Sequence, residues 1–221
     1  MSRTLLLSQR GLIISSQAIA GSPLQDPNAL VRMGIDSLIG GASALRLAGA
    51  EVVALARTFT EAPIIGIIKT ERKGFEPRIT ATVAEIEALK NAGAEIVGID
   101  STNRRRPEPL EKLYKRAHEL RLEIFADIAT LEEAKSAHDK GAQYVATTMA
   151  GYTSDRALTV GPDFELLESM VNSGMTVVAE GRFATSKDIL NAFRLGAHSV
   201  VIGRAVTSPQ TVVRQLLKEI S

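Results

Sequence analysis

Two residues with side chains that can transfer protons, Glu180 and Lys69, each follow a run of small or β-branched apolar residues. The run before Glu180 is Val177-Val178-Ala179, and the run before Lys69 is Ile64-Ile65-Gly66-Ile67-Ile68. Desolvating a charged group at the end of a buried strand costs free energy, and such groups are enriched in active sites. Desolvation would lower the pKa of Lys69, which makes its amine a candidate base or Schiff-base former. The structural alternatives are a salt bridge for Glu180 and, for Lys69, a side chain that extends into solvent.

Two glycine–arginine pairs, Gly181-Arg182 and Gly203-Arg204, follow the last two candidate strands. Glycine allows close backbone approach, and a guanidinium binds phosphate through paired hydrogen bonds. In α/β barrels a phosphate group frequently binds between the loops that follow strands seven and eight. The two pairs therefore predict a phosphate site. The alternative is that both arginines are exposed turn residues paired with nearby acids.

Eight short β-rich runs alternate with longer segments at helical spacing, which is typical of a parallel sheet with crossover helices. The predicted strands are Leu12–Ser16, Ala44–Leu47, Ile64–Lys69, Ile96–Asp100, Glu123–Asp127, Tyr144–Thr147, Thr176–Glu180 and Ser199–Gly203. The predicted helices are two less regular segments around Ile35 and Val53, followed by Thr82–Asn91, Pro107–Leu120, Leu131–Lys140, Phe164–Val171, Lys187–Leu195 and Ser208–Ile220.

The dipeptide Gly-Ala recurs at intervals of about 50 residues and supports this count of strands. Its copies precede the second, fourth, sixth and eighth predicted strands, where glycine is the expected helix cap, at positions 41–42, 93–94, 141–142 and 196–197. Four βαβα quarters with little insertion predict an α/β fold, a single (β/α)8 TIM barrel of the phosphate-binding type that spans residues 1–221 as one domain. A doubly wound open sheet is the alternative, but no G-x-G-x-x-G motif follows the first strand.

Active sites of such barrels lie at the carboxyl ends of the strands. The polar residues at these positions are Gln17, Arg46, Lys69, Asp100, Asp127, Thr147-Thr148 and Glu180. Strands three and seven lie opposite each other in a ring of eight, so Lys69 and Glu180 should face each other across the mouth. Two proton-transfer groups on opposite sides of a substrate can address opposite faces of one carbon.

The composition excludes several other kinds of site. Cysteine is absent, which removes disulfides, thiolate nucleophiles and cysteine-based metal sites. The 26 basic and 25 acidic residues give a net charge of +1, too small to predict binding to nucleic acid or to an anionic membrane. No apolar run approaches the roughly 20 residues of a membrane span, and Arg10 interrupts the N-terminus before a signal region develops. We therefore expect a soluble, cytoplasmic protein without a nucleic-acid or membrane partner.

Histidines and clustered arginines are assigned to the periphery. His118, His138 and His198 fall in or after helices on the side away from the mouth, so no histidine-based metal site is predicted. The run Arg104-Arg105-Arg106 is short and opens a helix in a nearly neutral protein, which favours a loop over a nucleic-acid contact. Since this run follows strand four, one of its arginines could reach an anionic substrate.

Six segments carry a resemblance to a known family that covers nearly the whole chain. They are Gly11-Leu12-Ile13 leading to Ser16-Gln17-Ala18, Pro63 to Lys69, Ala126-Asp127-Ile128 leading to Thr130-Leu131-Glu132-Glu133, Thr147-Thr148 with Gly151-Tyr152-Thr153, Gly161 to Leu166, and Ala179 to Arg182. On these segments the chain resembles the N-acetylmannosamine-6-phosphate 2-epimerases. It departs from the family pattern at Ser16, Thr70 and Ser208.

The resemblance implies a phosphate-binding (β/α)8 barrel that interconverts N-acetylmannosamine 6-phosphate and N-acetylglucosamine 6-phosphate in sialic acid catabolism. It implies Lys69 and Glu180 as the catalytic pair, with Gln17, Arg46 and Asp127 around the sugar. The expected partner is a small sugar phosphate, with neither a metal nor another cofactor, and the expected assembly is a homo-oligomer, a dimer.

Inverting a carbon next to an aldehyde requires removing its hydrogen to form a planar enediolate and returning a proton to the other face. We hypothesise that neutral Lys69 removes the C2 proton and Glu180 donates to the opposite face, with the roles exchanged in the reverse direction. Arg46 would stabilise the oxyanion, while Asp127 would orient the sugar and Gln17 its N-acetyl group. The alternatives are a decarboxylase or lyase on the same fold, and a sugar-phosphate binding protein without catalysis.

Overall fold

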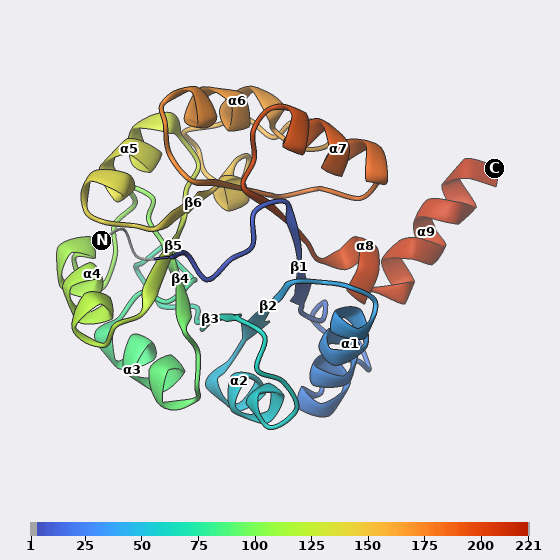
Figure 1. The fold of residues 1–221 in the computed structure, drawn as a ribbon, viewed down its shortest axis with the longest axis horizontal. Helices are drawn as coiled ribbons and strands as arrows, with labels where there is room; N and C mark the ends of the chain where they lie inside the picture. Colours follow the sequence, from blue (N-terminus) through green and yellow to red (C-terminus); the bar gives the residue numbers. More distant parts are fainter. Residues whose placement is uncertain (1–3, 221) are drawn as a thin grey trace.

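Eight parallel strands form a closed barrel in the computed structural model, which describes residues 4–220 (Figure 1). Each strand pairs with the next along the chain, and β1 also pairs with β8, which closes the ring. This confirms the (β/α)8 barrel and excludes the open sheet. The strands are β1 (Gly11–Ser16), β2 (Ala44–Ala48), β3 (Ile64–Ile67), β4 (Ile96–Asp100), β5 (Glu123–Asp127), β6 (Tyr144–Ala146), β7 (Val177–Glu180) and β8 (Ser199–Ile202).

The helices lie outside the barrel and close to their predicted positions. They are α1 (Pro27–Ile39), α2 (Ala50–Arg57), α3 (Val83–Asn91), α4 (Leu110–Glu119), α5 (Leu131–Asp139), α6 (Phe164–Asn172), α7 (Ser186–Arg194), α8 (Arg204–Thr207) and α9 (Pro209–Ile220), with a 3-10 turn, η1 (Thr147–Met149), after β6. The helix predicted from Ser208 to Ile220 is preceded by the separate short α8. Ser208 has extended backbone between the two helices because the following proline disfavours helical conformation there.

Local sequence fixes both ends of many helices. Helices α3, α5 and α7 begin with capping boxes in which a threonine side chain and an acid three residues later satisfy each other's backbone N–H groups. The four Gly-Ala glycines all have positive φ, between 94° and 104°, after α1, α3, α5 and α7. The repeat seen in the sequence is therefore the signal that ends alternate helices and starts alternate strands.

The apolar core has two parts. One fills the space between strands and helices, and the other fills the inside of the barrel, where its residues include Ile13, Ile65, Phe125 and Val201. A filled interior makes the barrel a packed core, and substrate can approach only from its ends.

The N-terminal segment closes the end of the barrel opposite the mouth (Figure 1). The Leu7 backbone N–H donates to the Tyr144 hydroxyl at 2.9 Å, and that hydroxyl donates to the buried Glu123 carboxylate at 2.7 Å. The Leu7 carbonyl lies 2.8 Å from Nε2 of His198. The N-terminal segment therefore covers and stabilises this end, and the active site is expected at the opposite end of the barrel.

The last helix leaves the barrel (Figure 1). Only the four-residue α8 follows β8 on the barrel, and α9 projects away from it with Val213, Leu216 and Ile220 exposed. Within residues 4–220, no helix is long and apolar enough to cross a membrane. The cytoplasmic location stays a prediction.

Candidate active site

A cavity of about 680 Å³ opens at the carboxyl ends of the strands. This volume is typical of a site for a small ligand. Eight of the nine residues predicted for the site line it, namely Gln17, Arg46, Lys69, Glu180, Gly181, Arg182, Gly203 and Arg204. Asp127 is the exception, because its side chain is fully buried beneath the cavity floor.

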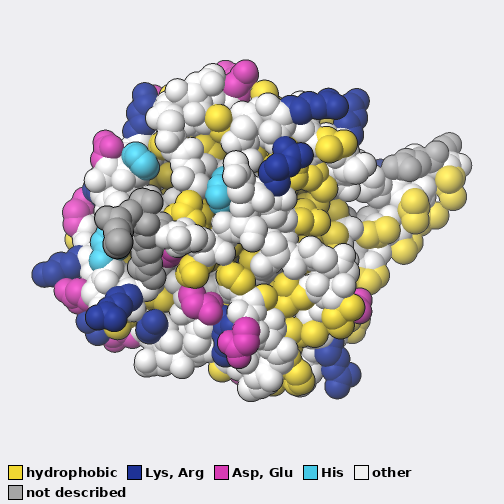
Figure 2. All heavy atoms as spheres, in the orientation of Figure 1, with side chains coloured by type: hydrophobic (Ala, Val, Ile, Leu, Met, Phe, Trp, Pro, Cys, Tyr) yellow, Lys and Arg dark blue, Asp and Glu magenta, His cyan; other side chains and the backbone are white. Residues whose placement is uncertain are grey.

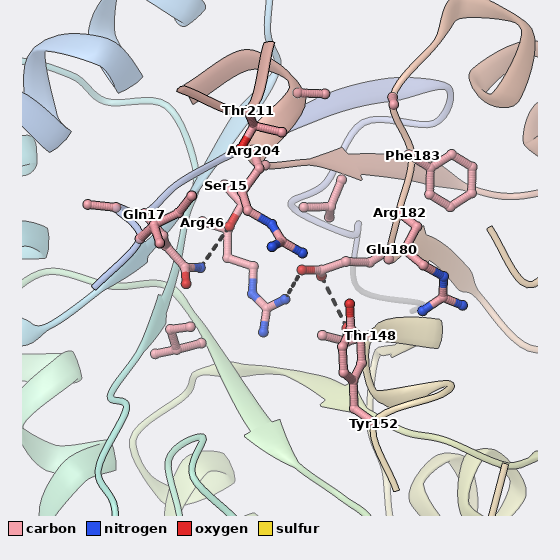
Figure 3. A pocket seen from close by; sticks show the side chains of 18 of the residues that line it. Ser15, Gln17, Arg46, Thr148, Tyr152, Glu180, Arg182, Phe183, Arg204 and Thr211 are labelled. Atoms are coloured by element: carbon pink, nitrogen blue, oxygen red, sulfur yellow. Dashed lines mark hydrogen bonds and ion pairs between the residues drawn. The ribbon is translucent and has the colours of Figure 1, made fainter. Parts of the chain in front are cut away.

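Arg46 is the centre of the site. Its side chain is only 1% exposed, and its Nη2 donates to both oxygens of Asp127 at 2.9 and 2.8 Å. Its Nη1 forms an ion pair with Oε1 of Glu180 (Figure 3). Gly98 on β4 lies beside this guanidinium, and a Cβ there would clash with Ile67 at 2.5 Å but would make only ordinary contact with Nη2 of Arg46, at 3.6 Å. One cation thus joins carboxylates from β5 and β7 through the interior of the barrel.

Burial and charge act in opposite directions on this triad. Burial by itself would lower the pKa of Arg46, but the carboxylates of Asp127 and Glu180 outweigh it and hold the pKa above the ordinary value. Burial raises the pKa of Asp127, and Arg46 only partly offsets that effect. Arg46 therefore compensates the burial of the Asp127 carboxylate incompletely.

Lys69 lies beyond the end of β3, which stops at Ile67, two residues before the predicted end. Its Nζ donates to Oε1 of Gln17, and Nε2 of Gln17 donates to the Ser15 hydroxyl at 2.7 Å (Figure 3 shows the second contact). The amine is open to solvent at the mouth but enclosed by protein on its other sides. Burial, followed by the positive charge of Arg46, lowers the pKa of Lys69. The direction of this shift agrees with the prediction for a lysine that acts as a base.

Two adjacent threonines hold Glu180. The Thr147 hydroxyl accepts from the Glu180 backbone N–H at 3.1 Å and donates to its carbonyl at 2.8 Å. The Thr148 hydroxyl donates to Oε2 of the Glu180 carboxylate at 3.1 Å (Figure 3). The sequence placed both threonines at the mouth but indicated no role for them, because these contacts join neighbouring strands.

The two predicted glycine–arginine turns differ. Gly181 and Arg182 both have positive φ, 107° and 61°, and the Arg182 guanidinium turns to the β6–α6 loop. It donates to the carbonyls of Gly161 and Ala150 at 2.6 and 2.9 Å and to the Thr159 hydroxyl at 2.8 Å. This arginine therefore fastens a loop beside the cavity.

Arg204 takes a different direction and extends toward the same central space as Arg46 and Glu180 (Figure 3). Among the described residues no acidic side chain forms an ion pair with it, although it lies close enough to Lys69 to influence that amine. It is the arginine of the two turns whose guanidinium faces the cavity.

Other polar residues considered from the sequence lie elsewhere. Asp100 is fully buried and pairs with Arg104 at 2.7 Å, and Arg106 donates to its carbonyl at 2.7 Å. These arginines do not line the cavity, so the idea that one of them reaches an anionic substrate there is not supported. No histidine lines the cavity either. Within residues 4–220, no group of three or more histidine, aspartate or glutamate side chains could hold a metal ion.

The closed barrel and this mouth, with an amine and a carboxylate around a central guanidinium, define a (β/α)8 barrel with a candidate active site at the carboxyl ends of its strands. The model of the family "Putative N-acetylmannosamine-6-phosphate epimerase" matches residues 30–221. The chain belongs to this family.

Individual relatives agree with this assignment. A "Putative N-acetylmannosamine-6-phosphate 2-epimerase" of Clostridioides difficile (strain 630) is 38% identical over 212 residues, 95% of either chain. The solved structure of the N-acetylmannosamine-6-phosphate 2-epimerase from Clostridium perfringens is 35% identical, with a TM-score of 0.93 over 96% of this chain and 94% of that one. A thiamine phosphate pyrophosphorylase from Pyrococcus furiosus, 19% identical with a TM-score of 0.62 over 95% of this chain and 96% of that one, shares the fold.

Replacing Arg46 with methionine should strongly destabilise the protein, because it leaves Asp127 buried without its cation. Breaking a buried ion pair in this way costs about 3–5 kcal/mol. The matched control is Arg78→Met, since the pair of Arg78 with Glu71 is exposed and worth under about 1 kcal/mol. Urea unfolding of both variants measures the difference. Similar losses of unfolding free energy in the two variants would show that the buried ion pair contributes no more to stability than the exposed one.

Proposed function

We propose that this chain interconverts N-acetylmannosamine 6-phosphate and N-acetylglucosamine 6-phosphate, a step of sialic acid catabolism, by moving the proton on C2. The observation that carries the proposal is the placement of Lys69 and Glu180 in one cavity, with Arg46 paired to Glu180. Family membership supports the same reaction. The activity is that of an isomerase.

The reaction needs one group to remove a proton and another to supply one. Either neutral Lys69 acts with protonated Glu180, or the Lys69 ammonium acts with the Glu180 carboxylate. These two arrangements hold the same single proton and serve opposite directions, as microscopic reversibility requires. Arg46 stabilises the oxyanion that develops when C2 loses its proton, a contribution of about 3–4 kcal/mol for a well-placed donor.

The other predicted residues receive roles that fit their surroundings. Asp127 acts through Arg46, because it is buried behind that guanidinium and orients it from below. Gln17 is assigned to the N-acetyl group as well as to the Lys69 amine, to which it is hydrogen-bonded.

The phosphate is assigned to the space between the turns after β7 and β8. In this assignment the Arg204 guanidinium and the backbone N–H groups of Gly181, Arg182 and Gly203 face the phosphate. The backbone takes this role at Arg182 because its guanidinium is hydrogen-bonded to the neighbouring loop.

We also propose that the enzyme is a dimer in which each α9 packs on the other copy. After β8, only the short α8 covers the barrel, whereas α9 projects away from it. The apolar side chains of α9 are exposed, with exposed fractions of 53% for Val213 and 56% for Leu216. Figure 2 shows hydrophobic side chains both along α9 and on the barrel surface between α7 and α1. Leu190 of α7 is half exposed. Two copies related by a twofold axis can each cover the surface that the other leaves open.

The catalytic pair is tested by solvent deuterium exchange followed by NMR. Wild-type enzyme should epimerise the sugar phosphate and place deuterium at C2. Both Lys69→Met and Glu180→Gln should lose epimerisation by at least about 100-fold. Each should retain exchange in one epimer only, because the surviving group still reaches one face of C2. Lys187→Met, on the exposed surface of α7, is the control.

Epimerisation by Lys69→Met at the native rate would refute the assignment. Loss of exchange in both epimers from one variant alone would indicate a single base. Release of a smaller fragment would identify a lyase or decarboxylase, and tight binding without turnover would identify a binding protein.

The pH dependence should show a fall in kcat/KM at high pH, because the Lys69–Glu180 pair then loses the one proton that the reaction requires. Since burial and Arg46 lower the pKa of Lys69, the midpoint of this fall should lie below the ordinary lysine value of 10.5. Arg204→Gln removes another positive charge that lowers this pKa and should move the midpoint upward. Arg194→Gln, on α7, should leave it unchanged. A midpoint at or above 10.5 would contradict the assignment of Lys69.

The dimer is tested by light scattering during size-exclusion chromatography. Wild-type protein should have the mass of two chains. Val213→Glu combined with Leu216→Glu should give a monomer, because charged side chains would then be buried at the interface. Arg214→Glu, on the same helix, is the control for added negative charge. A wild-type monomer at assay concentrations would refute this arrangement.

A further inference from the structure

Beyond the end of β3 the chain returns alongside the strand, and Lys69 pairs with Ile79 in an antiparallel bridge. The Thr80 N–H donates to the Ile68 carbonyl at 2.8 Å on one side of this pair, and the matching bond on its other side is 2.9 Å long. A pair flanked in this way is the non-hydrogen-bonded kind, in which the Cα atoms lie about 4.5 Å apart and the two side chains are close neighbours on one face. Both residues line the cavity, so the Ile79 side chain lies beside that of Lys69 at the mouth.

Thr80 fastens this returning segment to the barrel. It is fully buried and has a positive φ of 41°, which is unusual for a β-branched residue. Its hydroxyl accepts from the Ile68 N–H at 3.1 Å, so Thr80 pairs both backbone groups of Ile68. The Ile79 carbonyl accepts from the Asp100 N–H at 3.0 Å, which ties the segment to β4 as well. A backbone conformation this unfavourable persists only where its surroundings enforce it, and such residues cluster at functional sites.

A lysine that acts as a base at the mouth needs neighbours of this kind. Its flexible carbon stem ordinarily carries the amine into water. Ile79 is only 8% exposed and presents an apolar side chain to the cavity, while Oε1 of Gln17 accepts a hydrogen bond from the Lys69 amine. One neighbour therefore binds the amine, and the other covers the stem.

We propose that Ile79 is a positioning residue that covers the stem of Lys69, keeps water from that side of the amine and so favours the neutral form that removes the C2 proton. The proposal rests on the proton-transfer role assigned to Lys69 above. Ile79 takes part in no bond change and acts only through Lys69.

The charges around Lys69 are consistent with this role. Burial is the largest cause of its lowered pKa, ahead of every charge. Two cations lower the pKa further and two carboxylates raise it, namely Arg46 and Arg204 against Glu180 and Asp127. Arg78, next to Ile79, is paired with the exposed Glu71 at 2.8 Å. Since the charges oppose one another, the enclosing protein, to which Ile79 contributes, has the largest influence on the amine.

The catalytic test compares Ile79→Thr with Ile79→Val, because threonine and valine have the same shape and differ in one hydroxyl. Threonine brings a polar group and water to the amine, so the high-pH midpoint of kcat/KM should move upward. Near neutral pH kcat/KM should fall by about three- to tenfold in both directions, as expected when a pKa rises by about 0.5–1, with little change in KM. Valine keeps the apolar cover and should keep a midpoint close to that of wild type.

Ile86→Thr is the control for a hydroxyl placed in the core, since Ile86 is fully buried on α3 and does not line the cavity. It should leave the midpoint unchanged. A wild-type midpoint in Ile79→Thr would overturn the proposal. An equal upward shift in Ile79→Val or in Ile86→Thr would assign the effect to lost packing and would overturn it as well.

A second measurement does not depend on turnover. Carbon-13 NMR of protein labelled at the lysine ε-carbon, with the Lys69 signal assigned through Lys69→Met, follows the protonation of the amine directly. The pKa of Lys69 should be higher in Ile79→Thr than in wild type and unchanged in Ile86→Thr, because water reaches the amine only in the first variant. Ile79→Ala removes the cover without adding a hydroxyl. It should raise the pKa too, and it replaces Ile79→Thr if that variant does not fold.

The outcomes separate this proposal from the proposed function. If wild-type enzyme does not epimerise, the proposed function falls, and the NMR titration still decides whether Ile79 keeps water from the amine. If wild-type enzyme epimerises and the pKa of Lys69 is the same in wild type, Ile79→Thr and Ile79→Ala, the proposal alone is overturned.

Discussion

The buried guanidinium of Arg46 is the interaction on which the mouth of this barrel depends. A charge with 1% exposure needs partners, and Asp127 and Glu180 supply them from β5 and β7. Burial and, after it, the same positive charge lower the pKa of Lys69 just beyond the end of β3. One side chain thus pairs with carboxylates from two other strands and contributes to the lowered pKa of Lys69.

The two ends of the barrel differ in role: the closed end stabilises the fold, and the open end carries the candidate active site. At the closed end, Tyr144 joins the buried Glu123 to the N-terminal segment through two hydrogen bonds. At the open end, Arg46 and the Thr148 hydroxyl hold the Glu180 carboxylate, which faces the cavity. Among the described residues, Nε of Arg46 at the mouth and Oε1 of Glu123 at the closed end are buried without a hydrogen-bond partner, and the mouth opens into the cavity.

The acid and the base of an epimerase must exchange roles, which limits how tightly either can be held in one charge state. The threonines after β6 offer a neutral contact beside the ionic one, and Lys69 is held by the neutral amide of Gln17 in the same way. Each of the two groups proposed to transfer the proton therefore has a neutral hydrogen-bond partner.

Local patterns in the sequence were enough to predict the barrel. Apolar spacing, threonine capping boxes and the Gly-Ala repeat each act over a few residues and determine where each helix or strand begins and ends. Strand ends then indicated Lys69, Arg46 and Glu180, because the barrel gathers its strand ends at one mouth. Only the tertiary structure decided that Arg46 joins two carboxylates, that the Arg182 guanidinium binds a loop, that Asp127 lies below the cavity and that α9 leaves the barrel. These features depend on which side chains from distant strands meet and on the space between them, and neither is encoded by residues adjacent in the chain.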